Sequence, residues 1–301
     1  MVIKHIVISG GGPTGLLSYG AAKHLAQQGF WSHDTIETIY GTSIGSLIGA
    51  MLCLKHDWST LDDYIIKRPW EKVIADSLEM FELFSCKGVA KMKLLDDIMR
   101  PLLESKDLTL AVTLREFYEY SHISLNVFTV ELNAFQKVQM SHTTHPDLAL
   151  MDAIKMSSCV PMMFQPIVRD GCCYIDGGII VNYPLHECLE DTQCSPREVL
   201  GLRNLWSNPN EGIGIQSSLL EYLRFINLQL VRLVNTTHMA NASTALNECA
   251  NEVMCHVKPD ITPAEWLSIM SDAGQRLAWI EDGVAFAKAF LNDATDPNEK
   301  K

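Results

Sequence analysis

Basic residues are scarce relative to acidic ones in this chain. Its 301 residues contain 24 Lys and Arg against 36 Asp and Glu, which gives a formal net charge of -12 at pH 7. Such a molecule repels phosphate backbones and strongly anionic membranes, so the composition argues against nucleic acid as a partner. Hydrophobic residues at 47% and charged residues at 20% are typical of a globular protein and argue against a disordered chain.

Paired cysteines and metal motifs are also lacking. The chain has 9 cysteines, an odd number, and Cys172 and Cys173 are adjacent, so we expect a reducing, cytoplasmic compartment instead of a complete disulfide framework. There is no Cys-x-x-Cys motif, and the closest histidines, His142 and His145, have no acidic or thiol companion at ligand spacing. We therefore predict that the protein uses no metal.

No hydrophobic run is long enough for export or for a membrane span. Residues 1–9 are too few for the apolar core of a signal peptide, which takes about 7–15 residues. Residues 38–54 are uncharged but are interrupted by glycines, and they fall short of the about 20 apolar residues of a transmembrane helix. Without an export signal, the glycosylation sequons at Asn235 and Asn241 are interpreted as coincidental.

Alternating strand and helix patterns are what the first part of the chain does contain. Residues 2–8 form a β-branched apolar run that ends in glycines, which is typical of a buried parallel strand. The pattern then predicts a helix at 16–28 that stops at Gly29, a strand at 36–40, and a second helix that follows from Ile44. This order favours a mostly parallel sheet with helices on its faces.

The later part of the chain predicts further elements and then a helical tail. A mostly helical stretch, a two-strand hairpin, a helix and a strand follow in order (58–121, 123–132 with 136–141, 148–158, 172–175). Apolar residues at alternating three- and four-residue steps predict two amphipathic helices, from 216 to 233 and from 266 to 291, which we expect to pack on the domain and not to form a dimer seam. We expect a core at 1–200 and a helical C-terminal extension at 201–301 packed on the same domain.

A glycine loop follows the first predicted strand. Gly10-Gly11-Gly12-Pro13-Thr14-Gly15 matches the dinucleotide-binding pattern G-x-G-x-x-G between a strand and a helix. That pattern also requires an acid at the end of the second strand, whereas Asp34 and Glu37 precede or begin that strand. A dinucleotide-dependent enzyme is therefore one alternative interpretation.

A second glycine motif follows the second predicted strand. Gly41-x-Ser43-x-Gly45 is typical of a nucleophile elbow, in which the serine lies on a strained strand-to-helix turn with its hydroxyl exposed. Glycines on either side remove Cβ atoms that would clash in so tight a turn. Backbone amides of the first loop would stabilise the oxyanion that forms when a serine attacks an ester, so the two motifs together predict acyl transfer.

The serine requires a base, and the histidines do not supply an evident one. His186, His238 and His256 stand in no recognisable motif and are interpreted as structural or exposed. Asp176 ends a predicted strand and is followed by two glycines, so its carboxyl group can point at a hydroxyl from a neighbouring strand. Because the ordinary pKa of an aspartate is about 3.9, this role requires partial burial.

Three motifs in this order resemble the patatin-like phospholipase family: the glycine loop, the elbow around Ser43, and Asp176-Gly177-Gly178. Flanking stretches agree, namely the segment from Asp152 to Pro166 and Asn182-Tyr183-Pro184. The resemblance covers about residues 3–190. It implies an α/β fold, a three-layer sandwich with a mostly parallel central sheet, helices on both faces and a helical C-terminal layer.

The resemblance also implies the site and the activity. Ser43 is then the nucleophile and Asp176 its sole base; the backbone of Gly10, Gly11 and Gly12, with Ile44 after the serine, is the oxyanion hole, and Gly41 and Gly45 form the elbow. These roles belong to a lipid acyl hydrolase without metal or cofactor. A catalytically silent lipid-binding protein on the same fold is a second alternative.

Two departures from the family pattern bear on the substrate. Ser9 and Thr14 stand where the family often has an aspartate and a basic residue. A cationic contact with a phosphate headgroup is therefore lost, and the sequence leaves phospholipid, neutral lipid and simple ester open.

An acyl chain requires an apolar groove, and the chain offers one candidate stretch. Met80, Phe81, Leu83 and Phe84, with Trp70 upstream, are candidates for a lid or a membrane-touching patch, with core packing as the alternative. Any transient contact with a membrane surface is expected to depend on apolar insertion, because the chain is acidic. The oligomeric state stays open.

Overall fold

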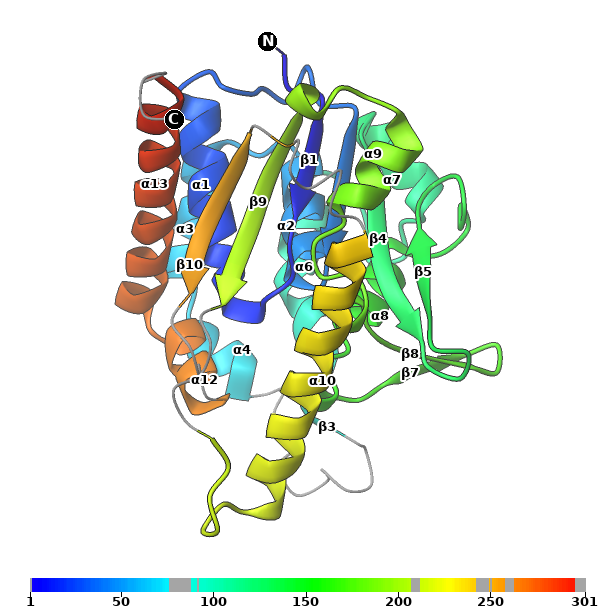
Figure 1. Cartoon of the computed structure of the whole chain (residues 1–301). Helices are drawn as coiled ribbons and strands as arrows, with labels where there is room; N and C mark the ends of the chain where they lie inside the picture. The colour runs from blue at the N-terminus through cyan, green and yellow to red at the C-terminus, as the bar shows by residue number, and fades with distance from the viewer. Residues whose placement is uncertain are drawn as a thin grey trace.

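The structure is a computed structural model, and it describes residues 2–75, 88–90, 92–206, 212–241, 249, 251–257 and 263–295. Its centre is an eight-stranded sheet in the order β10-β9-β1-β2-β4-β8-β7, with β5 paired to β4 beside this path (Figure 1). The strands are β1 (His5–Ile8), β2 (Thr38–Thr42), β4 (Ser124–Glu131), β5 (Gln136–Met140), β7 (Ile167–Arg169), β8 (Cys172–Asp176), β9 (Val199–Trp206) and β10 (Glu252–Val257). Two short strands, β3 (Gly88–Ala90) and β6 (Met162–Phe164), pair separately.

Five neighbouring strands of the large sheet are parallel. β10, β9, β1, β2 and β4 run in one direction, so their carboxyl ends meet at one edge, the lower edge in Figure 1. β5 and β8 are antiparallel to β4, and β7 is antiparallel to β8. The expected α/β sandwich with a mostly parallel sheet is confirmed.

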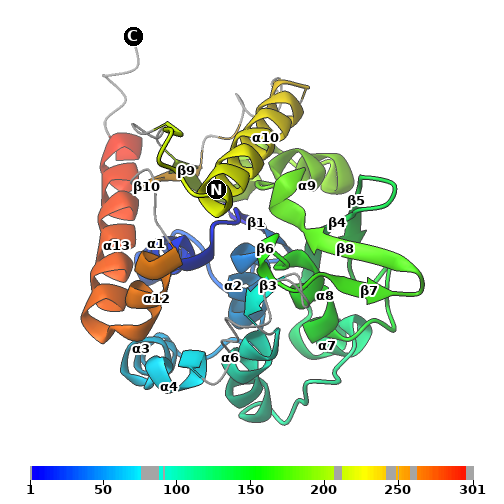
Figure 2. The same ribbon diagram turned by 90° about the horizontal axis from the view of Figure 1, so that it is seen from below.

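Helices cover both faces of this sheet, because successive residues of its buried strands point to opposite sides. Ile6 and Ile8 belong to the apolar cluster shared with α1 and α2, whereas Val7 belongs to the cluster shared with α9. Figure 2 shows these helices around the sheet from below. The helices are α1 (Gly15–Gln27), α2 (Ile44–Cys53), α3 (Trp58–Lys67), α4 (Trp70–Ala75), α6 (Lys93–Glu104), α7 (Leu114–Ser121), α8 (Leu150–Ser157), α9 (Leu185–Thr192), α10 (Leu219–Asn241), α12 (Pro263–Ser271) and α13 (Ala273–Thr295).

The first half of the chain follows the sequence prediction closely. The order β1, α1, β2, α2 and the antiparallel hairpin of β4 and β5 are confirmed. Helix α1 ends just before Gly29, whose φ of 71° is unfavourable for residues with a side chain.

The tail differs from the expected helical extension. β9 begins at Val199 and pairs with β1, so the expected boundary at residue 200 falls inside a central strand. β10 then pairs with β9, and the tail therefore contributes two parallel strands as well as helices. The helix expected from 266 to 291 is two helices, because Asp272 interrupts it and its carboxylate accepts the Gln275 amide at 2.7 Å, as an N-cap does.

A buried arginine joins the tail to the core. The Arg276 side chain of α13 is only 2% exposed. Its guanidinium donates to the carbonyls of Ile65, Ile66 and Met270 at 2.8, 2.6 and 2.5 Å. The charge is thus surrounded by acceptors, which fixes α12 and α13 against the end of α3.

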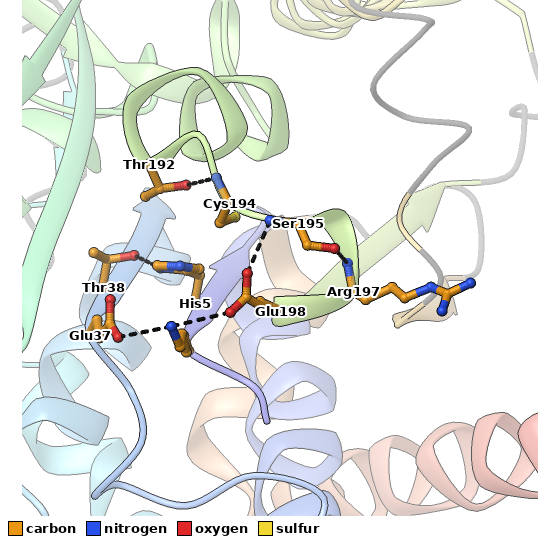
Figure 3. A network of polar contacts seen from close by, with 9 residues as sticks. His5, Glu37, Thr38, Thr192, Cys194, Ser195, Arg197 and Glu198 are labelled. Carbon is orange, nitrogen blue, oxygen red and sulfur yellow. Dashed lines mark hydrogen bonds and ion pairs between the residues drawn. The ribbon is translucent and has the colours of Figure 1, made fainter. Parts of the chain in front are cut away.

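The amino edge of the sheet is held by paired polar groups (Figure 3). Lys4 lies between Glu37 and Glu198, with N···O distances of 3.5 and 3.2 Å. The His5 ring bonds the Thr38 hydroxyl at 2.8 Å, and Glu198 accepts the Ser195 amide at 3.1 Å. These contacts join the starts of β1, β2 and β9, at the edge opposite the two glycine motifs.

Candidate active site

Ser43 lies on the turn between β2 and α2, at the carboxyl edge of the sheet. Its φ of 54° and ψ of -125° are unusual for a residue with a side chain. A Cβ added to Gly41 would lie 2.5 Å from the Gly45 carbonyl oxygen, and one added to Gly45 would lie 2.9 Å from the Ser9 carbonyl oxygen. Only glycine fits at these two positions, and the sharp turn that presents Ser43 depends on both.

Hydrogen bonds from neighbouring elements fix the backbone of this turn. The Ser43 amide donates to the Ser157 hydroxyl at 2.8 Å, and that hydroxyl donates to the Phe128 carbonyl at 2.5 Å. The Ser46 hydroxyl donates to the Ser43 carbonyl at 2.6 Å. Helix α8 and strand β4 therefore hold the serine in a conformation that it would not adopt alone.

Strand register brings Asp176 to the same level of the sheet as Ser43. Thr42 pairs with Phe128 in β4, and the next residue of β4, Thr129, pairs with Asp176 in β8. Ser43, which follows Thr42, and Asp176 therefore both lie level with Thr129, on either side of β4. Because β8 is antiparallel to β4, the aspartate approaches from the opposite direction.

Burial determines the chemistry of the Asp176 carboxyl group. The residue is 5% exposed, and its Oδ1 accepts the Gly178 amide at 2.7 Å. Its Oδ2 is buried and has no well-formed hydrogen bond within the part of the chain that the structure describes. Burial raises the pKa of Asp176 to about 6, and interaction with the Ser43 hydroxyl and then with the Gly178 amide limits the rise.

The glycine loop after β1 lies against the serine. Gly11 and Gly12 have φ values of 151° and 62°, and a Cβ added to Gly10 would lie 3.3 Å from the Ser43 Cβ. The Gly10 amide donates to the Asn182 carbonyl at 2.9 Å, so it is occupied, which differs from the expected role of Gly10 as an oxyanion donor. Within the described residues, the amides of Gly11, Gly12 and Ile44 donate to no acceptor of the protein.

An apolar pocket lies beside strand β8, which carries Asp176, and neither Ser43 nor Asp176 is among its lining residues. Its volume is about 390 Å³, and it lies between the β4–β5 hairpin, the segment before β7, strand β8 and helix α10. Ile175 and Ile179, on either side of Asp176 and its glycines, form part of its wall. The remaining lining residues are Leu132, Phe135, Cys159, Pro161, Phe164, Pro166, Leu230, Val231 and Val234. A pocket of this size and lining suits an alkyl chain.

A protein-family model for patatin-like phospholipase matches residues 6–189, more than half of the chain. The chain belongs to this family. An uncharacterized protein of Acanthamoeba polyphaga mimivirus is 27% identical over 190 residues, which are 61% of this chain and 60% of that protein. A protein of Invertebrate iridescent virus 6, described as a "probable lipid hydrolase", is 22% identical over 247 residues, 80% of this chain and 81% of that protein.

The fold of this chain is also similar to that of a solved structure. The crystal structure of VipD from Legionella pneumophila is similar with a TM-score of 0.56 and 15% sequence identity. The similarity covers 97% of this chain and 67% of that chain. It therefore extends through the C-terminal region, which the family model does not match.

Three asparagines lie around the patatin-like site, and the sequence predicted no contact with the site for any of them. The Asn235 side chain of α10 accepts the Asn182 amide at 3.1 Å and donates to the Gly178 carbonyl at 2.7 Å. Asn182 in turn accepts from Gly10, and the Asn204 amide donates to the Ser9 hydroxyl at 2.9 Å. The aspartate loop and the glycine loop are thus connected through α10. Asn235 is also the first residue of a glycosylation sequon, and its side chain is engaged in these hydrogen bonds.

An aromatic residue from the tail covers the glycine loop. A Cβ added to Gly12 would lie 2.7 Å or less from atoms of the Trp266 indole. The sequence gives little indication of this contact, because Gly12 and Trp266 are more than two hundred residues apart. Asn182 belongs to the stretch Asn182-Tyr183-Pro184 that resembles the family, but nothing in the sequence indicated what it contacts.

The structure does not support a dinucleotide in the glycine loop. Glu37 pairs with Lys4 at the amino edge of the sheet, and Asp34 comes just before it in the chain. These acids lie at the opposite end of β2 from the loop, so they are not placed to hold a ribose bound there. No other observation favours that alternative.

The remaining candidates from the sequence lie elsewhere. His186 pairs with Glu190 on α9 at 3.1 Å, and His256 lies in strand β10, not in a tail helix as expected. Met80, Phe81, Leu83 and Phe84 lie outside the described residues, and Trp70 is buried, with its indole donating to the Ile65 carbonyl at 2.8 Å. Among the described residues, no group of three or more His, Cys, Asp and Glu side chains is arranged to hold a metal ion.

Proposed function

We propose that this chain hydrolyses carboxylic esters of lipids through an acyl-enzyme on Ser43. The observation that carries the proposal is a buried carboxyl group, Asp176, beside the hydroxyl of a serine on a strained turn. A base with a pKa of about 6 is ionised at neutral pH and accepts a proton more readily than an ordinary aspartate. Asp176 therefore suits the role of sole base, and no histidine is required.

The first half of the reaction forms the acyl-enzyme. Asp176 accepts the hydroxyl proton as Ser43 Oγ bonds to the ester carbonyl carbon, and the electron pair of the carbonyl moves to its oxygen. The amides of Gly11, Gly12 and Ile44 donate to this oxyanion, where preorganised donors contribute several kcal/mol. Asp176 then returns the proton to the leaving alcohol as the C–O bond breaks.

The second half releases the fatty acid. Water attacks the acyl carbon while Asp176 accepts its proton, and the same amides stabilise the second oxyanion. Ser43 Oγ leaves with the proton from Asp176, so serine and carboxylate return to their starting states. Each proton that Asp176 accepts is thus returned within the same half-reaction.

The family name and the apolar pocket both support a lipid as substrate. The pocket beside Ile175 and Ile179 offers an apolar site for an acyl chain. Thr14, where the family often has a basic residue, is buried and donates to the Gly11 carbonyl at 3.1 Å, so it stabilises the loop. The loop therefore supplies no cation from this position to select a phosphate headgroup.

A serine-to-alanine pair tests the proposal. Ser43→Ala removes the nucleophile, and we expect hydrolysis of a short-chain nitrophenyl ester to fall by at least about 10³-fold. Ser18→Ala is the matched control, because Ser18 is a buried serine of the adjacent helix α1 whose hydroxyl has no hydrogen bond within the described residues. Full activity in Ser43→Ala, or no activity in the unaltered protein, would overturn the proposal, and the second result would favour a silent lipid-binding protein.

A further inference from the structure

Helix α10 carries an exposed apolar face. Its members recur at alternating four- and three-residue steps, and Leu219 and Leu233, at its two ends, are 72% and 63% exposed. The apolar face of α10 consists of Leu219, Leu223, Ile226, Leu230 and Leu233, flanked by the exposed Tyr222. The sequence predicted that this helix packs on the domain, and in the structure the side chains of this stripe are exposed. An exposed apolar band of this length is unusual and indicates a binding surface.

The apolar face begins at the catalytic edge of the molecule. In Figure 1 the first turns of α10 extend below the carboxyl ends of β9 and β10, on the side of the sheet where β2 ends at Ser43. The segment before the helix adds Ile213 and the fully exposed Ile215. The start of α10, with its exposed leucines, therefore lies beyond the edge of the sheet at which Ser43 lies.

A neighbouring side of α10 lines the apolar pocket and contacts the aspartate loop. Val231 and Val234 line the apolar pocket beside Asp176, and Leu230 belongs both to the pocket and to the apolar face. Asn235 joins the helix to the aspartate loop at Gly178. An apolar surface thus continues from the outside of α10 into the pocket, with no charged residue among its members.

The composition of the helix favours a lipid surface over a second copy of the chain. A coiled-coil seam is flanked by charged residues, whereas the positions beside this stripe include the uncharged Tyr222, Asn227, Gln229 and Thr236. The 23 residues of α10 include only three charged ones, Glu221, Arg224 and Arg232. Because the whole chain carries a net charge of -12, an anionic membrane would repel it, and a zwitterionic surface would not.

We infer that the apolar face of α10, with Ile213 and Ile215, inserts into the surface of a zwitterionic phospholipid bilayer and places the candidate active site against it. The inference rests on the proposed function for its choice of lipid as partner. Insertion buries the apolar side chains at the level of the acyl chains, as amphipathic helices at interfaces do. The pocket lined by Leu230 then opens next to the lipid from which an acyl chain enters.

Vesicle flotation tests the inference. Unaltered protein and a Leu219→Gln/Leu223→Gln variant are mixed with phosphatidylcholine vesicles at low and at high salt, and the bound fraction is measured. We expect the unaltered protein to bind at both salt concentrations and the variant to bind at least about tenfold more weakly. Val2→Gln/Met254→Gln is the matched control, since these exposed apolar residues lie at the start of the chain and on strand β10, and we expect it to bind like the unaltered protein.

A second variant and two further measurements separate the outcomes. Ile215→Gln lies outside the helix and is expected to weaken binding by a smaller factor, which keeps the test valid if the double variant misfolds. Equal binding by all variants, or binding lost at high salt, would overturn the inference. A dimer by sedimentation that Leu219→Gln/Leu223→Gln converts to monomer, without vesicle binding, would overturn it in favour of a second copy. Hydrolysis of a soluble short-chain ester by the unaltered protein reports on the proposed function alone, so the two failures are distinguishable.

Discussion

The two edges of the central sheet are built on opposite principles. At the amino edge Lys4 pairs with Glu37 and Glu198, and the His5 ring is bonded to Thr38. At the carboxyl edge Ser43 has a positive φ, and in the described part Asp176 Oδ2 has no well-formed hydrogen bond and the amides of Gly11, Gly12 and Ile44 donate to no protein acceptor. At the amino edge, which has a structural role, the polar groups are paired with one another. At the carboxyl edge, polar groups are left available to form hydrogen bonds with a substrate.

The largest expected effect comes from removing the charge at the carboxyl edge. Asp176→Asn keeps an oxygen for the Gly178 amide but cannot accept the serine proton, so we expect kcat/KM to fall by about 10³-fold or more. The same change should stabilise the fold above the pKa of about 6 by about 2–3 kcal/mol, because a buried ionised carboxylate no longer has to be accommodated.

The pH dependence of this stabilisation has a fixed sign. The folded-state pKa of Asp176 is raised from 3.8 to about 6, so its contribution to stability is fully present below 3.8 and is lost as pH rises through about 6. Urea denaturation of the unaltered protein and of Asp176→Asn should give a higher free energy of unfolding for the variant only near and above pH 6, and equal values near pH 3.8. An advantage that grows as pH falls would contradict the burial argument.

A smaller effect on activity is expected from the asparagine that joins α10 to the site. Asn235→Ala frees the Gly178 carbonyl and the Asn182 amide, which should lower kcat for a soluble ester about tenfold and leave KM nearly unchanged. Because the Gly178 amide helps to lower the pKa of Asp176, loosening that loop should also shift the acid limb of the pH profile upward. Thr236→Ala, at the next and exposed position, is the control. A lower kcat with an unmoved pH profile would indicate only a structural role.

Strain at the elbow predicts a third effect, on stability. Ser43→Gly removes the side chain that disfavours the φ of 54°, and we expect the free energy of unfolding to rise by about 1 kcal/mol after the entropic cost of glycine. The same change at Ser18, inside helix α1, should lower it by a similar amount. Thermal or chemical denaturation compares the two, and a loss of stability in both variants would argue against strain at the elbow.

The smallest effect on stability is expected from His5 at the amino edge. Its pH dependence is opposite to that of Asp176. Burial lowers the pKa of His5 below 6.5, so the unfolded chain binds a proton that the folded chain does not, and this stability is lost as pH falls below 6.5. In His5→Gln, the loss of stability that His5 causes below pH 6.5 should disappear, and kcat/KM should stay unchanged. Denaturation curves on both sides of pH 6.5 measure it, and an unchanged slope would show that His5 does not contribute.

The sequence predicted those parts of the fold that depend on local patterns. β1, α1, β2 and α2 are confirmed because apolar periodicity and the glycines at their ends are written in adjacent residues. β9 and β10 were not predicted, since β9 pairs with β1 across about two hundred residues and β10 takes its place by pairing with β9. The break at Asp272 was also missed, because a single capping residue interrupts an otherwise continuous apolar pattern.

The candidate site divides in the same way. The motifs around Ser43 and Asp176 stand in the sequence, and the structure brings them together through the register of β4. The residues that hold them, such as Ser157, Asn235 and Trp266, come from other segments, and their partners are set by packing alone. The occupied amide of Gly10 is a detail of this kind, because it depends on how Asn182 returns to the loop.

The most direct test of the central claim is the rate at which a fluorophosphonate labels Ser43 as a function of pH. Mass spectrometry identifies the labelled residue, and the rate reports how far the hydroxyl is activated. If Asp176 is the base, label appears on Ser43 and its rate rises with pH through about 6, and Asp176→Asn removes the rise. Label on another serine, or an unchanged pH dependence in Asp176→Asn, would contradict the account.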